Sequence, residues 1–192
     1  MKSQIILCSG GARSGKSEFA ERLALATEGR KAYVATGQAF DDEMVDRIKK
    51  HQERRGNIWT NFEIPLYLAE EWQHISSLAD VILIDCLTMF TTNHMMAHGS
   101  IQGQQDANRL EDTVLSELEA LLNLIKASDD KIVIFVTNEI GLGIVPDNKL
   151  ARYFRDIAGR VNRIVATEAD KLYLTISGVT IELKSQEVHI NG

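Results

Sequence analysis

The sequence has few cysteines and no long apolar run, and both shortages narrow the class of protein. Only two cysteines, Cys8 and Cys86, occur in 192 residues, each in or beside an apolar run. No disulfide framework is implied, and two reduced core thiols are expected. The N-terminal apolar run is too short for a signal peptide, and no run approaches the roughly 20 residues that a membrane span needs. We therefore expect a cytoplasmic protein without a membrane span.

Positive charge is also scarce. The chain carries 21 Lys and Arg against 27 Asp and Glu, a formal net charge of −6. Because non-specific affinity for nucleic acid requires spread-out positive charge, we expect no nucleic-acid partner. Any site for an anion must therefore be local.

Short apolar runs of strand length alternate with longer amphipathic segments. The predicted strands are 4–9, 31–37, 80–85, 131–137 and 171–177, and the predicted helices are 16–28, 41–55, 66–78, 111–127 and 148–169. The strands are almost continuously apolar, as expected when helices cover both faces of a sheet. This alternation predicts an α/β fold with a doubly wound, mostly parallel sheet in a single domain, residues 1–192.

Two further stretches complete this outline. Gly178 stands between two strand-like runs and predicts an antiparallel edge hairpin at the C-terminus. Residues 91–108 mix Met, Gly, Gln and Asn, a composition that predicts a loop or a partner surface.

The segment "GGARSGKS" (10–17) follows the first predicted strand and opens the first predicted helix. Gly10, Gly15, Lys16 and Ser17 match the P-loop pattern G-x-x-x-x-G-K-[ST]. The glycines allow backbone amides to face a phosphate, and the helix N-terminus adds partial positive charge. Lys16 is expected to reach the β- and γ-phosphates, and Ser17 to ligate Mg²⁺. A chance glycine-rich turn is the alternative, but the strand-loop-helix context favours a P-loop NTPase fold that binds a nucleoside triphosphate.

Asp85 ends the apolar run of the third predicted strand. In P-loop proteins an acidic residue at such a place holds Mg²⁺ or its water shell. The alternatives are a solvated strand-end carboxylate and a general base for an acceptor hydroxyl. We favour the metal role because a part-buried carboxylate without a partner is costly.

The stretch "DRIKKHQERR" (46–55) sets a lone histidine among basic side chains. Read as a helix, it brings Arg47, His51 and Arg54 onto one stripe, which repels itself unless an anion lies against it. Neutral imidazole can attack phosphorus near pH 7, and the arginines would neutralise the phosphates and the departing pyrophosphate. Three alternatives remain: a solvated charged helix, a substrate clamp in a monofunctional P-loop kinase, and a nucleotide-switched binding module.

Five segments together resemble one family: "GGARSGKS", "ATGQAFDDEMVDRIKKHQERR", "LIDCLT", "VTNEIGLGIVP" and "ARYFRDIAGRVN". This is the bifunctional adenosylcobinamide kinase / adenosylcobinamide-phosphate guanylyltransferase family of cobalamin biosynthesis, and the likeness runs in order along nearly the whole chain. It implies phosphorylation of the aminopropanol hydroxyl of adenosylcobinamide by ATP or GTP. GMP is then transferred from GTP to that phosphate through a guanylylated histidine, here His51. The resemblance also implies a homotrimer.

The resemblance and the P-loop motif together define the expected site. His51 and Lys16 are the expected catalytic residues, and Ser17 and Asp85 the expected Mg²⁺ ligands. The expected nucleotide contacts are Gly10, Gly11, Ala12, Arg13, Ser14, Gly15, Lys16, Ser17, Thr36, Gly37, Gln38, Gln52, Glu53, Arg54, Arg55, Glu63 and Asp85. The family often carries glutamate at the position of Asp85, and some relatives carry a second histidine where this chain has Lys50.

Residues 136–162 are expected to bind substrate or to form a subunit interface. Asn138 and Glu139 at the start of this segment are candidate contacts for corrinoid or nucleotide. The helix that follows is expected to gain support from the i,i+4 pairs Arg152–Asp156 and Asp156–Arg160.

Overall fold

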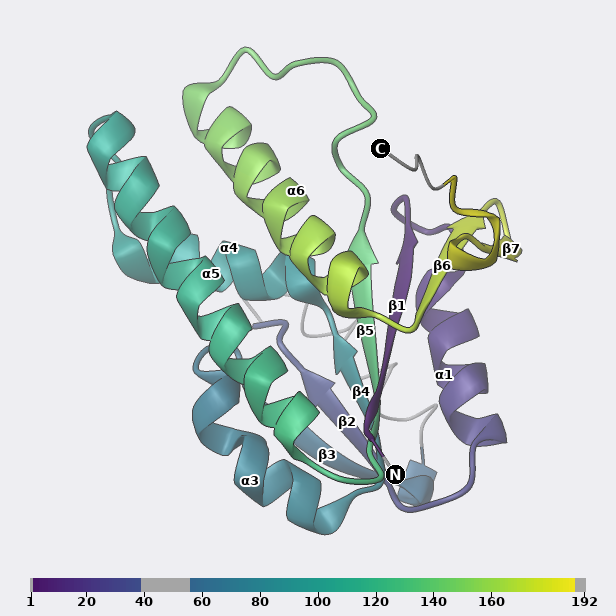
Figure 1. The fold of residues 1–192 in the computed structure, drawn as a ribbon. Helices are drawn as coiled ribbons and strands as arrows, with labels where there is room; N and C mark the ends of the chain where they lie inside the picture. The colour runs from purple at the N-terminus through teal and green to yellow at the C-terminus, as the bar shows by residue number, and fades with distance from the viewer. Residues whose placement is uncertain (1, 39–55, 189–192) are drawn as a thin grey trace.

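The structure is a computed structural model that describes residues 2–38 and 56–188. Its strands form one seven-stranded sheet in the order β3-β2-β4-β5-β1-β6-β7 (Figure 1). The strands are β1 (Gln4–Gly10), β2 (Lys31–Ala35), β3 (Trp59–Glu63), β4 (Val81–Asp85), β5 (Ile132–Asn138), β6 (Lys171–Ile176) and β7 (Val179–Glu182). The helices are α1 (Lys16–Ala26), α3 (Leu68–Leu78), α4 (Leu87–His98), α5 (Gln104–Ala127) and α6 (Lys149–Glu168), with short 3₁₀ helices at Gly56–Ile58 and Lys184–Gln186.

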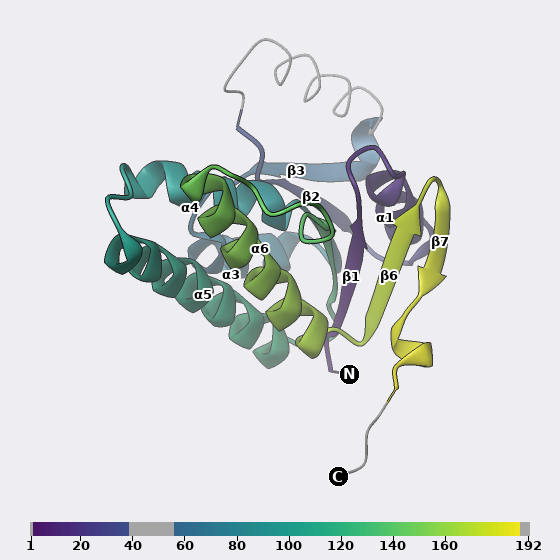
Figure 2. The same ribbon diagram turned by 90° about the horizontal axis from the view of Figure 1, so that it is seen from above.

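The sheet has the predicted doubly wound arrangement. Neighbouring strands run parallel throughout except β6 and β7, which form the predicted antiparallel hairpin at the C-terminal edge. Helices α3, α5 and α6 cover one face of the sheet, and α1 lies against the other (Figures 1 and 2). Within the described part of the chain, no helix combines the length and apolar character needed to cross a membrane.

Both faces of the central strands are buried, which explains their almost continuous apolar sequences. Successive side chains of a strand point to opposite faces. In β5, Val133 and Phe135 pack with α3, α5 and α6, whereas Ile134 and Val136 pack in a second cluster with α1. All four side chains are 0% exposed. Cys8 and Cys86 belong to the second cluster as buried, unpaired thiols, as predicted.

The predicted strands are confirmed, with ends that differ by one or two residues. The sequence pattern does not predict β3, because "WTNFE" is an edge strand that buries only Trp59 fully and so lacks an apolar run. The predicted helix over 41–55 lies outside the described residues.

The prediction of a loop over 91–108 is wrong, because most of that stretch is helical. Helix α4 continues to His98, and α5 begins at Gln104, seven residues before the predicted start at 111. The pattern is misleading because α4 is buried on several sides and includes the buried polar residues Thr91 and Asn93. A helix enclosed in this way shows no amphipathic period.

The predicted ion pairs within α6 are also wrong. Arg152 instead donates to the backbone carbonyl oxygens of Pro146 and Asp147, while Asp156 pairs with its neighbour Arg155. Arg160 reaches across to Glu111 of α5. These arginines therefore connect α6 to the preceding loop and to α5 rather than supporting one face of the helix.

Candidate active site

The predicted site residues lie where the parallel strands end, at what we call the carboxyl edge of the sheet. Strand register places Gly10 opposite Asn138, and Ala35 opposite both Asp85 and Glu63. Parallel α/β sheets bind ligands beyond this edge, because every strand there runs into a loop. Segments far apart in the sequence therefore meet around one opening.

The P-loop lies between β1 and α1, as the motif predicts, and two glycines are required by its geometry. A Cβ atom on Gly10 would lie 2.4 Å from the carbonyl oxygen of Thr175 on β6. Gly15 caps α1 in the left-handed region with φ of 95°, a conformation that other residues adopt at a cost. These positions let the loop turn tightly into the helix.

Two buried polar groups of the P-loop suit an anionic ligand. Lys16 is only 7% exposed, and its Nζ donates to the carbonyl oxygen of Gly11 at 3.1 Å. The Ser14 hydroxyl is also buried and finds no hydrogen-bond partner among residues 2–38 and 56–188. A phosphate bound in the loop would satisfy that hydroxyl, and buried polar groups in native proteins are rarely left unsatisfied.

Asp85 is held at the end of β4 by a tyrosine from the neighbouring strand. The phenol of Tyr33, itself buried, donates to Asp85 Oδ2 at 3.0 Å. The Tyr33 ring meets the Trp59 ring edge to face, with centroids 5.9 Å apart. The carboxylate orientation is therefore fixed from within the core.

Two buried thiols border the site: Cys8 lies two residues before Gly10, and Cys86 directly follows Asp85. Burial, with a smaller contribution from the negative charge of Asp85, raises the pKa of Cys8 to about 12. Burial and Asp85 likewise raise the pKa of Cys86 to about 11, against an opposing influence of the Lys16 charge. Both thiols therefore remain protonated at neutral pH.

The described residues offer few protein ligands for a metal ion. Across 2–38 and 56–188, no three His, Cys, Asp or Glu side chains are grouped to hold one. Ser17 and Asp85 are both half-buried beside the loop. This donor set fits Mg²⁺ bound chiefly through substrate phosphates and water, as that ion prefers, rather than a cage made of protein ligands.

The ends of β2 and β3 form the second half of the site. Thr36 is fully buried: its amide donates to the Asp85 carbonyl at 3.1 Å, and its hydroxyl exchanges 2.7 Å bonds with the backbone of Cys86. Gly37 and Gln38 follow it half-buried, and Glu63 is exposed at the end of β3. The remaining predicted residues of this half lie outside the described residues, namely His51, Gln52, Glu53, Arg54 and Arg55.

The segment after β5 enters the site through its backbone. The amide of Glu139 donates to the Gly10 carbonyl at 3.0 Å, and the Glu139 carboxylate accepts from the amide of Gly141 at 2.6 Å. The amide of Asn138 donates to Thr88 Oγ1 at 2.9 Å, and its carbonyl accepts from Asn162 Nδ2 at 3.1 Å. The loop is thereby fixed beside the P-loop.

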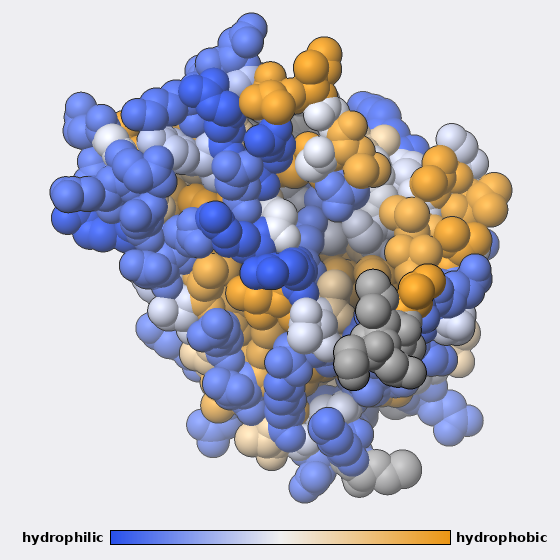
Figure 3. Space-filling model, turned by 45° about the horizontal axis from the view of Figure 1, so that its top comes forward, coloured by the Kyte–Doolittle hydropathy of each residue, from blue (hydrophilic) through white to orange (hydrophobic). Residues whose placement is uncertain are grey.

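The same loop exposes several apolar side chains. Leu142 is 87% exposed and Ile144 is 96% exposed. Apolar side chains gather over this face of the molecule (Figure 3). Exposed apolar groups beside a binding site are typical of contact surfaces.

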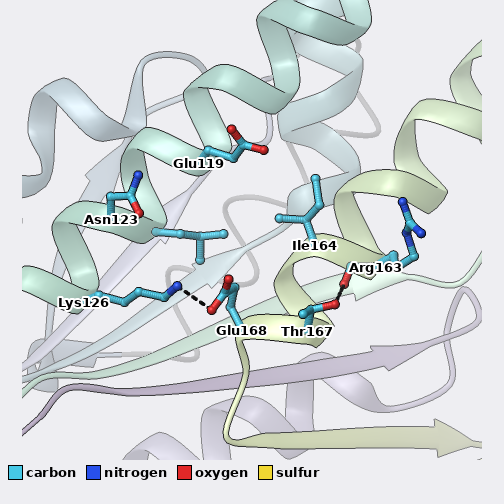
Figure 4. A pocket seen from close by; sticks show the side chains of 8 residues that line it. Glu119, Asn123, Lys126, Arg163, Ile164, Thr167 and Glu168 are labelled. Carbon is cyan, nitrogen blue, oxygen red and sulfur yellow. Dashed lines mark hydrogen bonds and ion pairs between the residues drawn. The ribbon is translucent and has the colours of Figure 1, made fainter. Parts of the chain in front are cut away.

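A separate groove lies between α5 and α6, with a volume of about 430 Å³ (Figure 4). Its lining includes Lys126 and Glu168, which form an ion pair across it. Both residues lie near the C-terminal ends of their helices, where the chain turns toward the starts of β5 and β6. The groove is therefore at the opposite edge of the sheet from the P-loop, and its charges neutralise each other, so we do not assign it to the active site.

The side chains that hold the strand ends of the site in place through hydrogen bonds were not predicted from the sequence. These are Tyr33, Thr88, Asn93 and Asn162, whose bonds join residues distant in the sequence. Thr88 and Asn162 end two of the segments that carry the family resemblance, "LIDCLT" and "ARYFRDIAGRVN", but those segments do not reveal which groups these side chains bond. A further signal was polar residues inside segments that the pattern leaves ambiguous, such as "CLTMFTTNHMMAH".

Comparison with known proteins identifies close relatives along almost the full chain. Residues 6–183 match the family described as cobinamide kinase / cobinamide phosphate guanyltransferase. The bifunctional adenosylcobalamin biosynthesis protein CobU of Escherichia coli (strain K12) is 38% identical over 189 residues, which cover 94% of this chain and 99% of that protein. The protein of the same name from Salmonella typhimurium is 40% identical with the same coverage. CobP of Pseudomonas aeruginosa is 37% identical over 180 residues, covering 94% and 97%.

A solved structure supports the fold alone. A prototypical ATPase from the type III secretion system of pathogenic bacteria superimposes with a TM-score of 0.57 at 12% identity. The match covers 97% of this chain and 59% of that one. The P-loop NTPase fold predicted from the sequence is consistent with this neighbour.

Proposed function

We propose that this chain, which belongs to the cobinamide kinase / cobinamide phosphate guanyltransferase family, catalyses two successive reactions on adenosylcobinamide. ATP or GTP first phosphorylates the hydroxyl of the aminopropanol arm. GMP is then transferred from GTP to the new phosphate, which gives adenosylcobinamide-GDP in cobalamin biosynthesis. The observation that carries this proposal is the match to bifunctional relatives over 94% of the chain.

The kinase step needs positioning more than covalent chemistry. The acceptor hydroxyl attacks the γ-phosphorus in line, and the bond to the β-γ bridging oxygen breaks. Lys16 neutralises charge on the β- and γ-phosphates, and the amides that begin α1 donate to phosphate oxygens. Bound Mg²⁺ supplies further neutralisation of the phosphates, and Ser17 and Asp85 are the residues that would hold it. The hydrogen bond from Tyr33 would keep the Asp85 carboxylate in one orientation.

The transfer step uses His51 as the nucleophile. A ring nitrogen attacks the α-phosphorus of GTP, the bond to the α-β bridging oxygen breaks, and pyrophosphate leaves. An oxygen of the corrinoid phosphate then attacks the same phosphorus, forms the diphosphate linkage and releases neutral His51. The proposed nucleotide contacts from described segments are Thr36, Gly37, Gln38, Glu63 and Asp85, and their placement along one sheet edge supports a common nucleotide position.

Product analysis tests the proposal. The purified protein would be incubated with adenosylcobinamide, Mg²⁺ and either ATP or GTP. The corrinoid products would then be separated by chromatography and identified by mass spectrometry. We expect the phosphate with either nucleotide and the GDP derivative only when GTP is present. A phosphate that is never converted would support a monofunctional kinase in which His51 clamps the substrate. GTP hydrolysis that a corrinoid does not change, without a corrinoid product, would support a nucleotide-switched module.

We further propose that the active form is a cytoplasmic homotrimer. The exposed Leu142 and Ile144 beside the site support a surface that a second subunit or the corrinoid covers. The buried, unpaired Cys8 and Cys86 suit a reducing compartment. Light scattering during size exclusion would give three times the chain mass, and the mass of a single chain would contradict the trimer.

A further inference from the structure

Asn93 of α4 is a buried side chain with an unusual pair of partners. It is 2% exposed, and its Nδ2 donates to the carbonyl oxygen of Thr36 at 2.7 Å and to that of Pro65 at 2.9 Å. Both amide protons are therefore used on the backbone. Since both partners are acceptors, they fix which end of the amide faces them.

The two carbonyls belong to the segments that leave two neighbouring parallel strands. Thr36 directly follows β2, and Pro65 comes two residues after β3. The strands also share a backbone bond at this end, from the amide of Ile64 to the carbonyl of Ala35 at 2.9 Å. One side chain from α4 thus sets the spacing of the two strand ends beyond the last ladder bond.

The strand ends that Asn93 joins carry proposed nucleotide contacts. Thr36 is the first residue of the Thr36-Gly37-Gln38 run, and Glu63 lies two residues before Pro65. The P-loop is built elsewhere, from β1 and α1, with a contact to the turn between β6 and β7: the amide of Gly178 donates to the carbonyl of Ser14 at 2.8 Å. Loss of the Asn93 side chain would therefore disturb the ends of β2 and β3 more than it disturbs the P-loop.

We propose that Asn93 is a positioning residue for the guanylyl-transfer step. It holds the ends of β2 and β3 at one separation, and neither of its hydrogen bonds within residues 2–38 and 56–188 reaches the P-loop. This inference rests on the proposed two-step function. Removal of the amide leaves one buried and one part-buried carbonyl oxygen without their donor, so these segments relax and the nucleotide contacts move apart.

Three variants test this role. Asn93→Ala removes the amide, and Asn93→Leu removes the donors while keeping most of the volume, so that one variant remains useful if the other fails to fold. Thr91→Val is the matched control: Thr91 is equally buried on the same helix, but among the described residues its hydroxyl bonds within α4, to the carbonyl of Leu87 at 3.0 Å. Thermal melting of each protein would be recorded first.

Each protein would then be compared in three assays: GMP adduct formation at rising GTP, equilibrium binding of a fluorescent GTP analogue, and the kinase reaction with ATP. We expect both Asn93 variants to need roughly tenfold more GTP for half-maximal adduct formation and for binding, while the kinase reaction, which uses only Asp85 from this half of the site, loses less than adduct formation does. Thr91→Val would melt earlier without a change in GTP dependence. Equal loss of both activities, or unchanged GTP dependence, would overturn the positioning role.

The outcomes separate this inference from the proposed function. If the wild type forms no adduct, the two-step function fails. The GTP-binding comparison still decides whether Asn93 positions a nucleotide: weaker binding by the Asn93 variants alone would support it, and equal binding would overturn it.

Discussion

The two halves of the proposed site are built in different ways. The P-loop half is made almost entirely by backbone, with Gly10 in close contact with β6, Gly15 capping α1, and Lys16 bonded to the carbonyl of Gly11. The other half, at the ends of β2, β3 and β4, is held by side chains. There Tyr33 holds Asp85, and Asn93 holds Thr36 and Pro65.

This difference explains why one half of the site can be identified from the sequence and the other cannot. A backbone-built loop needs glycines and a lysine at fixed spacing, so it can be identified from eight consecutive letters. A half held by side chains depends on partners 28 to 57 residues apart, and any of several residue types could supply one bond. The comparison predicts that the P-loop half tolerates almost no change at Gly10, Gly15 or Lys16, whereas the half held by side chains loses function gradually.

The largest effect is expected from Lys16→Ala. Loss of the buried ammonium removes the positive charge that we propose lies beside the β- and γ-phosphates, so kcat/KM of the kinase step should fall by about three orders of magnitude, and adduct formation should also decline. Steady-state kinetics of both steps would measure this. Lys2→Ala, which removes an exposed lysine, is the control and should match the wild type. If the Lys16→Ala protein kept most of its kinase activity, the claim that the P-loop half tolerates almost no change would be contradicted.

Substitutions at Gly10 and Gly11 test whether the backbone of the P-loop determines its function. In Gly10→Ala the new Cβ would clash with the Thr175 carbonyl 2.4 Å away, whereas nothing lies within 4 Å of a Cβ on Gly11. Gly10→Ala should lose about 1–3 kcal/mol of unfolding free energy and at least about tenfold in nucleotide affinity. Gly11→Ala should stay near wild type in urea unfolding. Similar behaviour of the two variants would show that the close contact is unimportant.

Tyr33→Phe tests the side-chain half. The change keeps the ring and its packing against Trp59 but removes the donor to Asp85 Oδ2. We expect a loss of about 1–3 kcal/mol in unfolding free energy, because a bond to a charged group is lost. The Mg²⁺ concentration for half-maximal kinase activity should also rise. An unchanged Mg²⁺ requirement, despite lower stability, would limit Tyr33 to a structural role.

The smallest effect at neutral pH concerns the two thiols. Folding raises the pKa of Cys8 to about 12 and that of Cys86 to about 11 from a usual value of 9.0. The folded state favours the neutral thiols, so their contribution to the free energy of unfolding is complete below the unfolded pKa of 9.0. That contribution is lost as the pH rises toward 11 and 12. The native protein should therefore react slowly with a thiol reagent at pH 9, and urea-unfolded protein rapidly. Fast labelling of the native state would contradict the burial of the thiols.

The central sheet could be predicted from the sequence, because strands covered on both faces leave long apolar runs such as "KIVIFVT". Strand β3 and helix α4 could not. An edge strand buries one residue fully, and an enclosed helix has no polar face to reveal its period. Both misread elements border the half of the site that side chains hold.

The candidate site divides in the same way. The P-loop and the end of β4 follow from local patterns, and the strand register places Gly10 and Asp85 at the same edge of the sheet. Tyr33 and Asn93 were not predictable, because their importance comes from the register of β2, β3 and β4 rather than from their own neighbours. The role of His51 remains a prediction from a basic stripe and a family resemblance.

The most direct test of the two-step account is the intact mass of the protein after incubation with GTP and Mg²⁺, for wild type and His51→Ala. We expect one GMP adduct on the wild type alone, removed by pyrophosphate, labile in acid and stable in alkali as a phosphoramidate is. His51→Ala should lack it while keeping most of its kinase activity. A folded wild-type protein that binds GTP but forms no adduct, or an adduct that persists in His51→Ala, would contradict the account.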